Sequence, residues 1–171
     1  MIMTNIAFNV LTILGSLIAG NYDMPSRHGI IIKQQMKVSW RATEGMVHFE
    51  LTAPVTGWMA IGLNTSSQLE GTYLIMARVV DDKAEVVEHK VISPGVYRPF
   101  QELDTGTAVA DIHGNEGEGT TTVSFSLPEM NVSPLAFPVN EGQDYKLLMA
   151  YSVSDDFQHH SIMRTSDTIQ F

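Results

Sequence analysis

The sequence predicts an all-β fold, packed as an antiparallel sandwich or barrel, and two observations support this. Apolar residues recur at every second position in several short runs, such as Val47, Phe49 and Leu51, which places them on one face of a strand. Turn-forming residues such as Ser93-Pro94-Gly95 separate these runs, and no long window after the first 20 residues keeps a helical period. Short strands at close spacing favour antiparallel sheets.

The expected strands follow this alternation along the chain. Met36, Val38 and Trp40 mark the first strand region, and Val123 and Phe125 mark a later one. The strands are expected at residues 29–41 (one strand or two), 46–53, 57–63, 72–80, 84–91, 107–112, 120–127, 144–152 and 162–171. Turns or connections are expected at residues 113–119 and at the proline-containing stretch 128–143.

The first 20 residues are typical of a secretory signal peptide rather than of a folded element. They contain no charged side chain, and Ile6 to Ala19 is a largely apolar stretch that ends in small residues. This stretch is shorter than the roughly 20 residues that a membrane span needs. We expect cleavage near Gly20 and one domain over residues 21–171, while an uncleaved anchor and a buried helix remain open alternatives. An exported chain without cysteine fits a periplasmic or extracellular location.

Composition excludes several functional classes. The chain has 10 Lys and Arg against 19 Asp and Glu, a formal net charge of −9, which argues against nucleic acid and against anionic membranes as partners. It contains no cysteine, which excludes disulfides, thiolate metal sites and covalent c-type haem. No motif of a hydrolase or a phosphate-binding loop occurs, so we do not expect an enzyme.

The order of several motifs resembles that of the DOMON domain family over about residues 28–171. The motifs are Val38-Ser39-Trp40, Gly57-Trp58-Met59-Ala60-Ile61-Gly62, Leu69-Glu70-Gly71, Ser154-Asp155-Asp156, and His160 followed by Arg164, Ser166 and the final Ile169-Gln170-Phe171. The resemblance implies an immunoglobulin-like antiparallel β-sandwich of about nine to eleven strands. Many members of the family resemble the cytochrome domain of cellobiose dehydrogenase, which binds b-type haem through Met and His and passes single electrons.

The resemblance places the histidine ligand of such a haem at His160, with Asp155, Asp156 or a backbone carbonyl as the partner of its second ring nitrogen. The usual methionine position holds Leu69, which cannot bind iron. Met76 is therefore the candidate second ligand, with Met59 and Met149 as further candidates on neighbouring strands. If His160 is the only ligand, the iron is five-coordinate and open to a small gas.

Two further residues are candidates for contact with the haem. Trp58 is either a core aromatic or a ring that stacks on the porphyrin, and Arg164 either meets a haem propionate or lies at the surface. The resulting hypothesis is a haem b protein that exchanges electrons with a redox partner, whose basic patch would match the negative charge of this chain. The alternative is a haem-free module for a sugar or another small ligand, with Trp58 and Tyr73 as platforms.

The remaining polar candidates carry weaker expectations. His48 and His89 lie beside Glu50 and Glu88, and both are expected to be solvated. The turn at residues 113–119 contains two Glu and one Asn, which would suit calcium, but it lacks the fixed spacing of a calcium loop.

Overall fold

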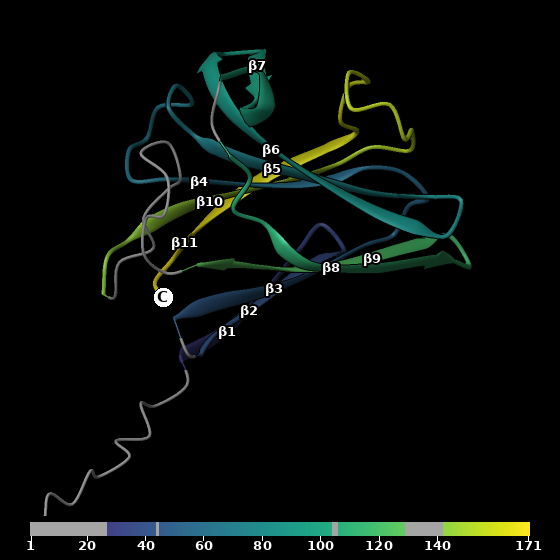
Figure 1. The fold of residues 1–171 in the computed structure, drawn as a ribbon, viewed down its shortest axis with the longest axis horizontal. Helices are drawn as coiled ribbons and strands as arrows, with labels where there is room; N and C mark the ends of the chain where they lie inside the picture. Colours follow the sequence, from purple (N-terminus) through teal and green to yellow (C-terminus); the bar gives the residue numbers. More distant parts are fainter. Residues whose placement is uncertain (1–26, 44, 104–105, 129–141) are drawn as a thin grey trace, which may run out of the picture.

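The computed structural model describes residues 27–43, 45–103, 106–128 and 142–171. In these ranges the chain forms two stacked antiparallel sheets, with one short 3₁₀ helix, which confirms the expected β-sandwich (Figure 1). The predicted signal segment, residues 1–20, and most of the expected connection 128–143 lie outside the described residues. No helix in the described ranges is long and apolar enough to span a membrane.

Eleven strands in the described residues make up the two sheets. The five-stranded sheet has the order β1-β2-β3-β9-β8 and the six-stranded sheet the order β11-β10-β4-β5-β6-β7. The elements are β1 (Arg27–Lys33), β2 (Met36–Thr43), β3 (Met46–Ala53), β4 (Met59–Asn64), β5 (Tyr73–Val80), β6 (Lys83–Ser93), β7 (Val96–Pro99), the 3₁₀ helix (Phe100–Leu103), β8 (Ala110–Gly117), β9 (Thr120–Pro128), β10 (Tyr145–Tyr151) and β11 (Met163–Ile169).

The differences from the expected strands lie at tight turns. The first strand region divides at Gln34 and Gln35, which both have positive φ and form a two-residue turn without the usual Asn or Gly. The expected turn at residues 113–119 is wrong for most of its length, because β8 continues to Gly117 and only Glu118 and Gly119 turn. In the described ranges, no group of three or more His, Asp or Glu side chains is arranged so that it could hold a metal ion. The strand β7 and the 3₁₀ helix were not expected.

The main core lies between the two sheets. It follows from the alternation, because the apolar positions of both sheets face each other, and Phe49 stacks on Phe125 with ring centroids 5.5 Å apart. The strand β4 breaks this pattern, because all six of its residues are buried. A strand buried on both faces requires cover on the outer side of its sheet as well.

A buried carboxylate fastens the segment that leads from the six-stranded sheet to the five-stranded one. Glu88, which is 2% exposed, accepts hydrogen bonds from the Tyr73 hydroxyl (2.5 Å), the Thr107 hydroxyl and the backbone N–H groups of Ala108 (2.8 Å) and Val109 (3.2 Å). Burial, and then the nearby Glu88 carboxylate, raises the pKa of the Tyr73 hydroxyl, so this hydroxyl keeps its proton and donates. Glu88 therefore provides acceptors that this non-strand segment lacks.

We predict that Glu88→Ala lowers the free energy of unfolding by about 2–4 kcal/mol, because it leaves several buried donors without an acceptor. Urea denaturation measures the change. The matched control is Glu50→Ala, which removes an exposed partner of Lys37 (2.6 Å) and should change stability by less than about 1 kcal/mol. Equal effects of the two substitutions would contradict the role given to Glu88.

Candidate functional site

A second apolar cluster covers the outer side of the six-stranded sheet, away from the main core. Its buried members are Trp58, Ala60 and Met76, and its partly buried members are Leu74, Tyr97, Ala150 and Phe157. We call these seven residues the outer-face cluster. The cluster supplies the outer cover that β4 requires.

The register of the strands assembles the floor of this cluster. Ala60 on β4 pairs with Met76 on β5 and with Ala150 on β10, so the three side chains form a row across the sheet. Successive residues of a strand face opposite sides, and Ile75 and Ala77 belong to the main core, so Met76 points outward. The small side chains of Ala60 and Ala150 leave room above the sheet beside the thioether.

The connection between β10 and β11, residues 152–162, forms the roof of the cluster. We call it the β10–β11 loop; in Figure 1 it rises from the six-stranded sheet on the side away from the five-stranded one. At its start Ser152 N–H donates to the Trp58 carbonyl (2.9 Å), and Trp58 N–H donates to the Ser154 carbonyl (3.0 Å). Gly57 permits this approach, because a Cβ there would lie 2.5 Å from the Ser152 carbonyl oxygen.

The aromatic ring of Phe157 is the part of the loop that fills the cluster. The guanidinium carbon of Arg78 lies 4.4 Å from the centroid of this ring, and Arg78 also donates to the Asp155 carbonyl (2.6 Å). The Tyr97 hydroxyl donates to the Phe157 carbonyl (2.5 Å). Burial, and then the nearby Asp156 carboxylate, raises the pKa of Tyr97, which keeps this donor protonated.

His89 lies beside the cluster and was missed as a site residue. The sequence suggested that it is solvated, and this is wrong, because the side chain is only 3% exposed. Its Nδ1 lies 3.1 Å from the Val87 carbonyl oxygen, and its ring meets those of Tyr97 and Phe157 nearly at right angles. Burial lowers the pKa of His89, which favours the neutral imidazole. His48, also expected to be solvated, is half-buried and bonds to Ser126 (2.7 Å).

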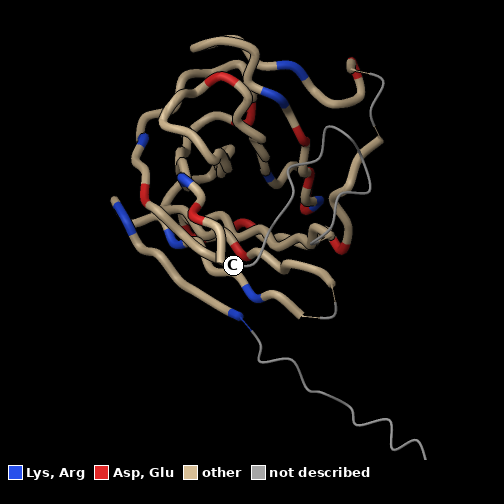
Figure 2. Tube along the Cα trace, turned by 90° about the vertical axis from the view of Figure 1, so that its left-hand side faces the viewer, with Lys and Arg blue, Asp and Glu red and all other residues tan. Residues whose placement is uncertain are grey.

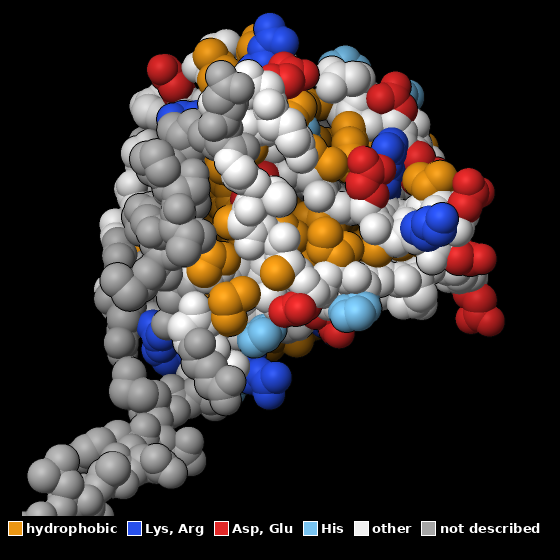
Figure 3. Space-filling view, in the orientation of Figure 1, with side chains coloured by type: hydrophobic (Ala, Val, Ile, Leu, Met, Phe, Trp, Pro, Cys, Tyr) orange, Lys and Arg blue, Asp and Glu red, His pale blue; other side chains and the backbone are white. Residues whose placement is uncertain are grey.

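The candidate ligand His160 lies on the β10–β11 loop and is exposed. Its carbonyl accepts a hydrogen bond from the Ser152 hydroxyl (3.1 Å), which fixes the backbone of the loop near this residue. Histidine side chains are visible on the surface in Figure 3, in the region where Figure 1 draws the β10–β11 loop. The structure therefore places Met76 in the floor of the site and His160 on its roof.

The other sequence candidates lie as follows. Trp58 is 5% exposed and belongs to the outer-face cluster, whereas Tyr73 is 4% exposed and faces the main core. These two rings lie on opposite faces of one sheet, so they cannot form a joint platform for a sugar. Arg164 is exposed on β11 opposite Ala150, and its Nε donates to the Ser161 hydroxyl.

Leu69 and His160 lie at opposite ends of the six-stranded sheet. The strands β4 and β10 are antiparallel, so the loop after Asn64 and the loop after Tyr151 leave from different ends. Leu69 is 41% exposed in a loop that Asn64 organises through hydrogen bonds to the carbonyls of Gln68 (3.0 Å) and Glu70 (3.2 Å). Along the strands, Met76 lies nearer to the end of the sheet that carries His160 than Leu69 does.

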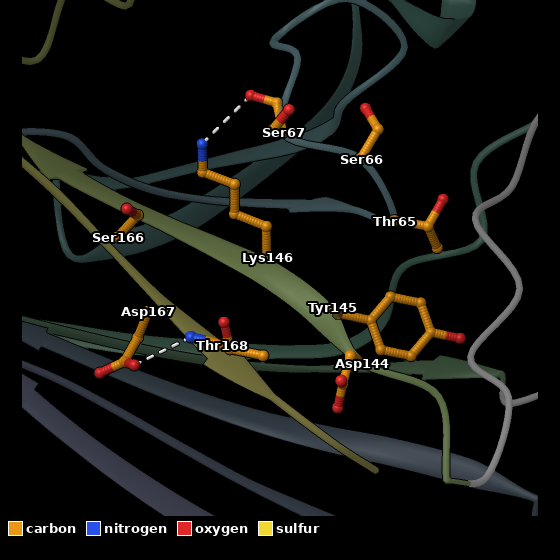
Figure 4. Close-up of a pocket in the computed structure, with 9 residues that line it drawn as sticks. All are labelled: Thr65, Ser66, Ser67, Asp144, Tyr145, Lys146, Ser166, Asp167 and Thr168. Atoms are coloured by element: carbon orange, nitrogen blue, oxygen red, sulfur yellow. Dashed lines mark hydrogen bonds between the residues drawn. The ribbon is translucent and has the colours of Figure 1, made fainter.

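A polar groove of about 580 Å³ lies at the Asn64 end of the same sheet (Figure 4). Its lining is rich in hydroxyl groups, and its three charged side chains are already engaged. Lys146 donates to the Ser67 carbonyl (3.3 Å), Asp167 pairs with Lys33 (2.9 Å), and Asp144 accepts a hydrogen bond from the Gln170 side chain (2.6 Å). The ring of Tyr145 is fully buried, so the groove has no exposed aromatic platform among its described residues.

Two buried polar atoms in and beside the outer-face cluster have no hydrogen-bond partner in the described part of the chain, Nε1 of Trp58 and Oδ1 of Asp155. Such atoms are rare in native proteins, because leaving one unpaired costs about 1–3 kcal/mol. An apolar floor with a thioether, a roof with an imidazole and two unpaired polar atoms in and beside the cluster fit a flat cofactor that carries a metal and polar substituents.

Comparisons with known proteins concern the family and the fold of the chain. The profile described as DOMON domain matches residues 32–152 of the chain. Among solved structures, the fold is similar to that of the cytochrome b domain of pyranose dehydrogenase from Coprinopsis cinerea, with a TM-score of 0.59 and 8% sequence identity, over 82% of this chain and 80% of the other. At this identity the likeness concerns the fold alone. No curated protein matches the chain.

We predict that stability falls on acidification partly because of His89. Its pKa is below the ordinary value of 6.5 in the folded chain, so the unfolded chain binds more protons as the pH falls through 6.5 toward the folded pKa, and this favours unfolding. The stability that depends on neutral His89 is therefore fully present above pH 6.5 and is lost as the pH falls toward the folded pKa. His89→Asn, which keeps a donor near the Val87 carbonyl, should reduce the loss of unfolding free energy between about pH 7.5 and about pH 5.5. The exposed residue His159 supplies the control, since His159→Asn should leave that loss unchanged; an unchanged loss in His89→Asn would contradict the assignment.

Proposed function

Because the chain belongs to the DOMON domain family, we propose that it is an exported b-type haem-binding domain that passes single electrons and is not itself an enzyme. The outer-face cluster carries this proposal, because a buried thioether lies beneath a loop that bears two histidines. The likeness of the fold to that of a cytochrome b domain supports the same function.

Met76 and His160 are the residues that would hold the iron. One comes from the floor of the site and the other from its roof, and a thioether and an imidazole are both side-chain groups that would bind haem iron. His89 is not a suitable partner for Met76. The two residues occupy diagonal positions on β5 and β6, since Met76 pairs with Val87 and Leu74 with His89, and side chains at such positions leave the sheet in the same direction.

The residues around these ligands would tune the site. Bound haem would supply a centre that accepts and releases one electron, at a potential set by its ligands and its burial. Trp58, Ala60 and Ala150 would keep water from its apolar side. Asp155 Oδ1, a buried acceptor without a donor in the described residues, lies on the same loop as His160, and we assign it the free ring N–H of that imidazole.

The surface charge suits a protein partner of opposite sign. The chain has a net charge of −9, and Figure 2 shows acidic residues distributed over the described trace rather than gathered in one place. We propose that the electron partner is a redox protein with a basic patch at its docking surface, because complementary charges steer association. The negative charge disfavours nucleic acid and anionic membranes as partners. An export signal at residues 1–20 would bring the domain to the periplasm or the exterior, free of the membrane after cleavage.

We predict that the chain, produced with haem available, has a Soret band and that His160→Ala abolishes it without unfolding the sandwich. The exposed position of His160 explains why the fold should survive. Absorption spectra before and after reduction test the cofactor, and far-ultraviolet circular dichroism tests the fold. The adjacent substitution His159→Ala is the control and should retain the spectrum. A normal spectrum in His160→Ala would disprove the ligand assignment, and a wild-type chain that binds no hemin would disprove the proposed function.

A second prediction concerns the thioether. Met76→Leu keeps the apolar volume but removes the sulfur, so the reduced spectrum should change from sharp six-coordinate bands to a broad five-coordinate form. Met149→Leu is the matched control, because Met149 is equally buried but faces the main core. An unchanged spectrum in Met76→Leu would exclude Met76 as a ligand. If the wild-type spectrum is itself five-coordinate, Met76 is also excluded, and six-coordinate bands in Leu69→Met would place the missing thioether at the other end of the sheet.

A further inference from the structure

We propose that the β10–β11 loop is a closed lid over a site for a flat aromatic ligand that bears a carboxylate, and that Trp58 and Arg78 recognise this carboxylate when the lid opens. The inference rests on the proposed function, in which the flat ligand is haem and the carboxylates are its propionates. It assigns the carboxylate contact to a residue that the sequence did not single out.

The indole of Trp58 supplies the first argument. The side chain is 5% exposed, and its Nε1–H has no acceptor in the described part of the chain. An indole nitrogen can only donate, so its missing partner must be an acceptor such as a carboxylate oxygen. A buried donor is expected to have a partner in the functional state, which indicates that the closed structure is not the ligand-bound one.

The position of Arg78 supplies the second argument. Arg78 lies two residues after Met76 on β5 and therefore on the same outer face. Met59 pairs with Ala77, so continuing this register by one residue places Trp58 across from Arg78. A guanidinium and an indole N–H at one end of the site form a corner that matches a carboxylate, which accepts two parallel hydrogen bonds from arginine.

The closed loop currently uses part of this corner. Arg78 Nη1 donates to the Asp155 carbonyl (2.6 Å), while its Nε and Nη2 contact the Glu85 carboxylate at 2.7 Å and 2.6 Å. Movement of the loop would free Nη1 and leave the pair with Glu85 in place. The exposed Glu85 would then keep the Arg78 guanidinium in its present position beside Trp58.

The loop is attached in a way that permits this movement. Its ends are fixed by the backbone bonds of Trp58 with Ser152 and Ser154 and by the bond from Ile162 N–H to the Tyr151 carbonyl (2.9 Å). Between these ends, the described sheet residues that bind the loop by hydrogen bonds are Arg78, Tyr97 and, next to the far end, Arg164. The ring of Phe157 packs against the cluster that contains Met76, so in this inference it takes the place of the ligand ring in the closed state.

Metal-free protoporphyrin IX and its dimethyl ester test the carboxylate corner without iron ligation. Fluorescence titration of the full chain should show that the acid binds more tightly than the ester by about tenfold. Arg78→Met and Trp58→Phe should each remove most of this difference, whereas the control Arg41→Met, on the other sheet, should retain it. The corner is excluded if acid and ester bind equally to the wild type, or if Arg164→Met removes the preference in place of Arg78→Met.

Acrylamide quenching of tryptophan fluorescence tests the lid without any ligand. Trp40 and Trp58 are the two tryptophans of the chain, so a Trp40→Phe background reports on Trp58 alone. Phe157→Ala should increase quenching of Trp58 and strengthen binding of protoporphyrin IX. Unchanged quenching and unchanged binding in this variant would overturn the lid.

The outcomes separate this inference from the proposed function. If hemin gives a Soret band but Arg78→Met and Trp58→Phe bind porphyrins as the wild type does, the inference fails and the proposed function stands. If protoporphyrin IX binds with the predicted preference but hemin gives no axial ligation, the inference stands and electron transfer fails. If neither porphyrin binds, both are overturned.

Discussion

Burial of the strand β4 on both faces of the six-stranded sheet is the constraint on which the rest of the structure depends. All six residues of β4 are buried, although one face suffices for the main core. A parallel sheet is covered on both sides by helices, but this chain has short connections between antiparallel strands. The outer cover must therefore come from a hairpin and a loop, and the β6–β7 hairpin and the β10–β11 loop provide it through Tyr97 and Phe157.

The hairpin and the loop cover candidate functional side chains on the outer face of the six-stranded sheet, which would be exposed to solvent in a simple sandwich. A loop gives weaker cover than a second sheet, since it is attached by few contacts and can open locally while the sandwich stays folded. The floor beneath it carries a thioether, the roof carries an imidazole, and the Nε1 of Trp58 in the same cluster has no hydrogen-bond partner among the described residues. The same feature that completes the packing of β4 thus creates a removable cover over a candidate cofactor site.

The sequence predicted the parts of the fold that local pattern determines. Alternation predicted the bounds of β3 without error and those of β9 within one residue, because each strand has one buried face and one more exposed face. The turn at Gln34-Gln35 has no composition signal, and His89 looks solvated between Glu88 and Lys90. Both involve partners far along the chain, Tyr151 for the turn and Phe157 for His89, as does the contact between Arg78 and Phe157, which no local pattern encodes. The DOMON resemblance pointed to His160, but the covering role of its loop came only from the tertiary structure.

Nuclear magnetic resonance of the two indole N–H groups tests the central claim most directly. Trp58 lies in the outer-face cluster and Trp40 in the main core, so a nitrogen-15 spectrum contains one indole signal from each candidate environment. The account predicts that paramagnetic ferric hemin shifts or broadens the Trp58 signal far more strongly than the Trp40 signal. A bound hemin that leaves the Trp58 indole unchanged, or that acts mainly on Trp40, would contradict the placement of the site on the outer face of the six-stranded sheet.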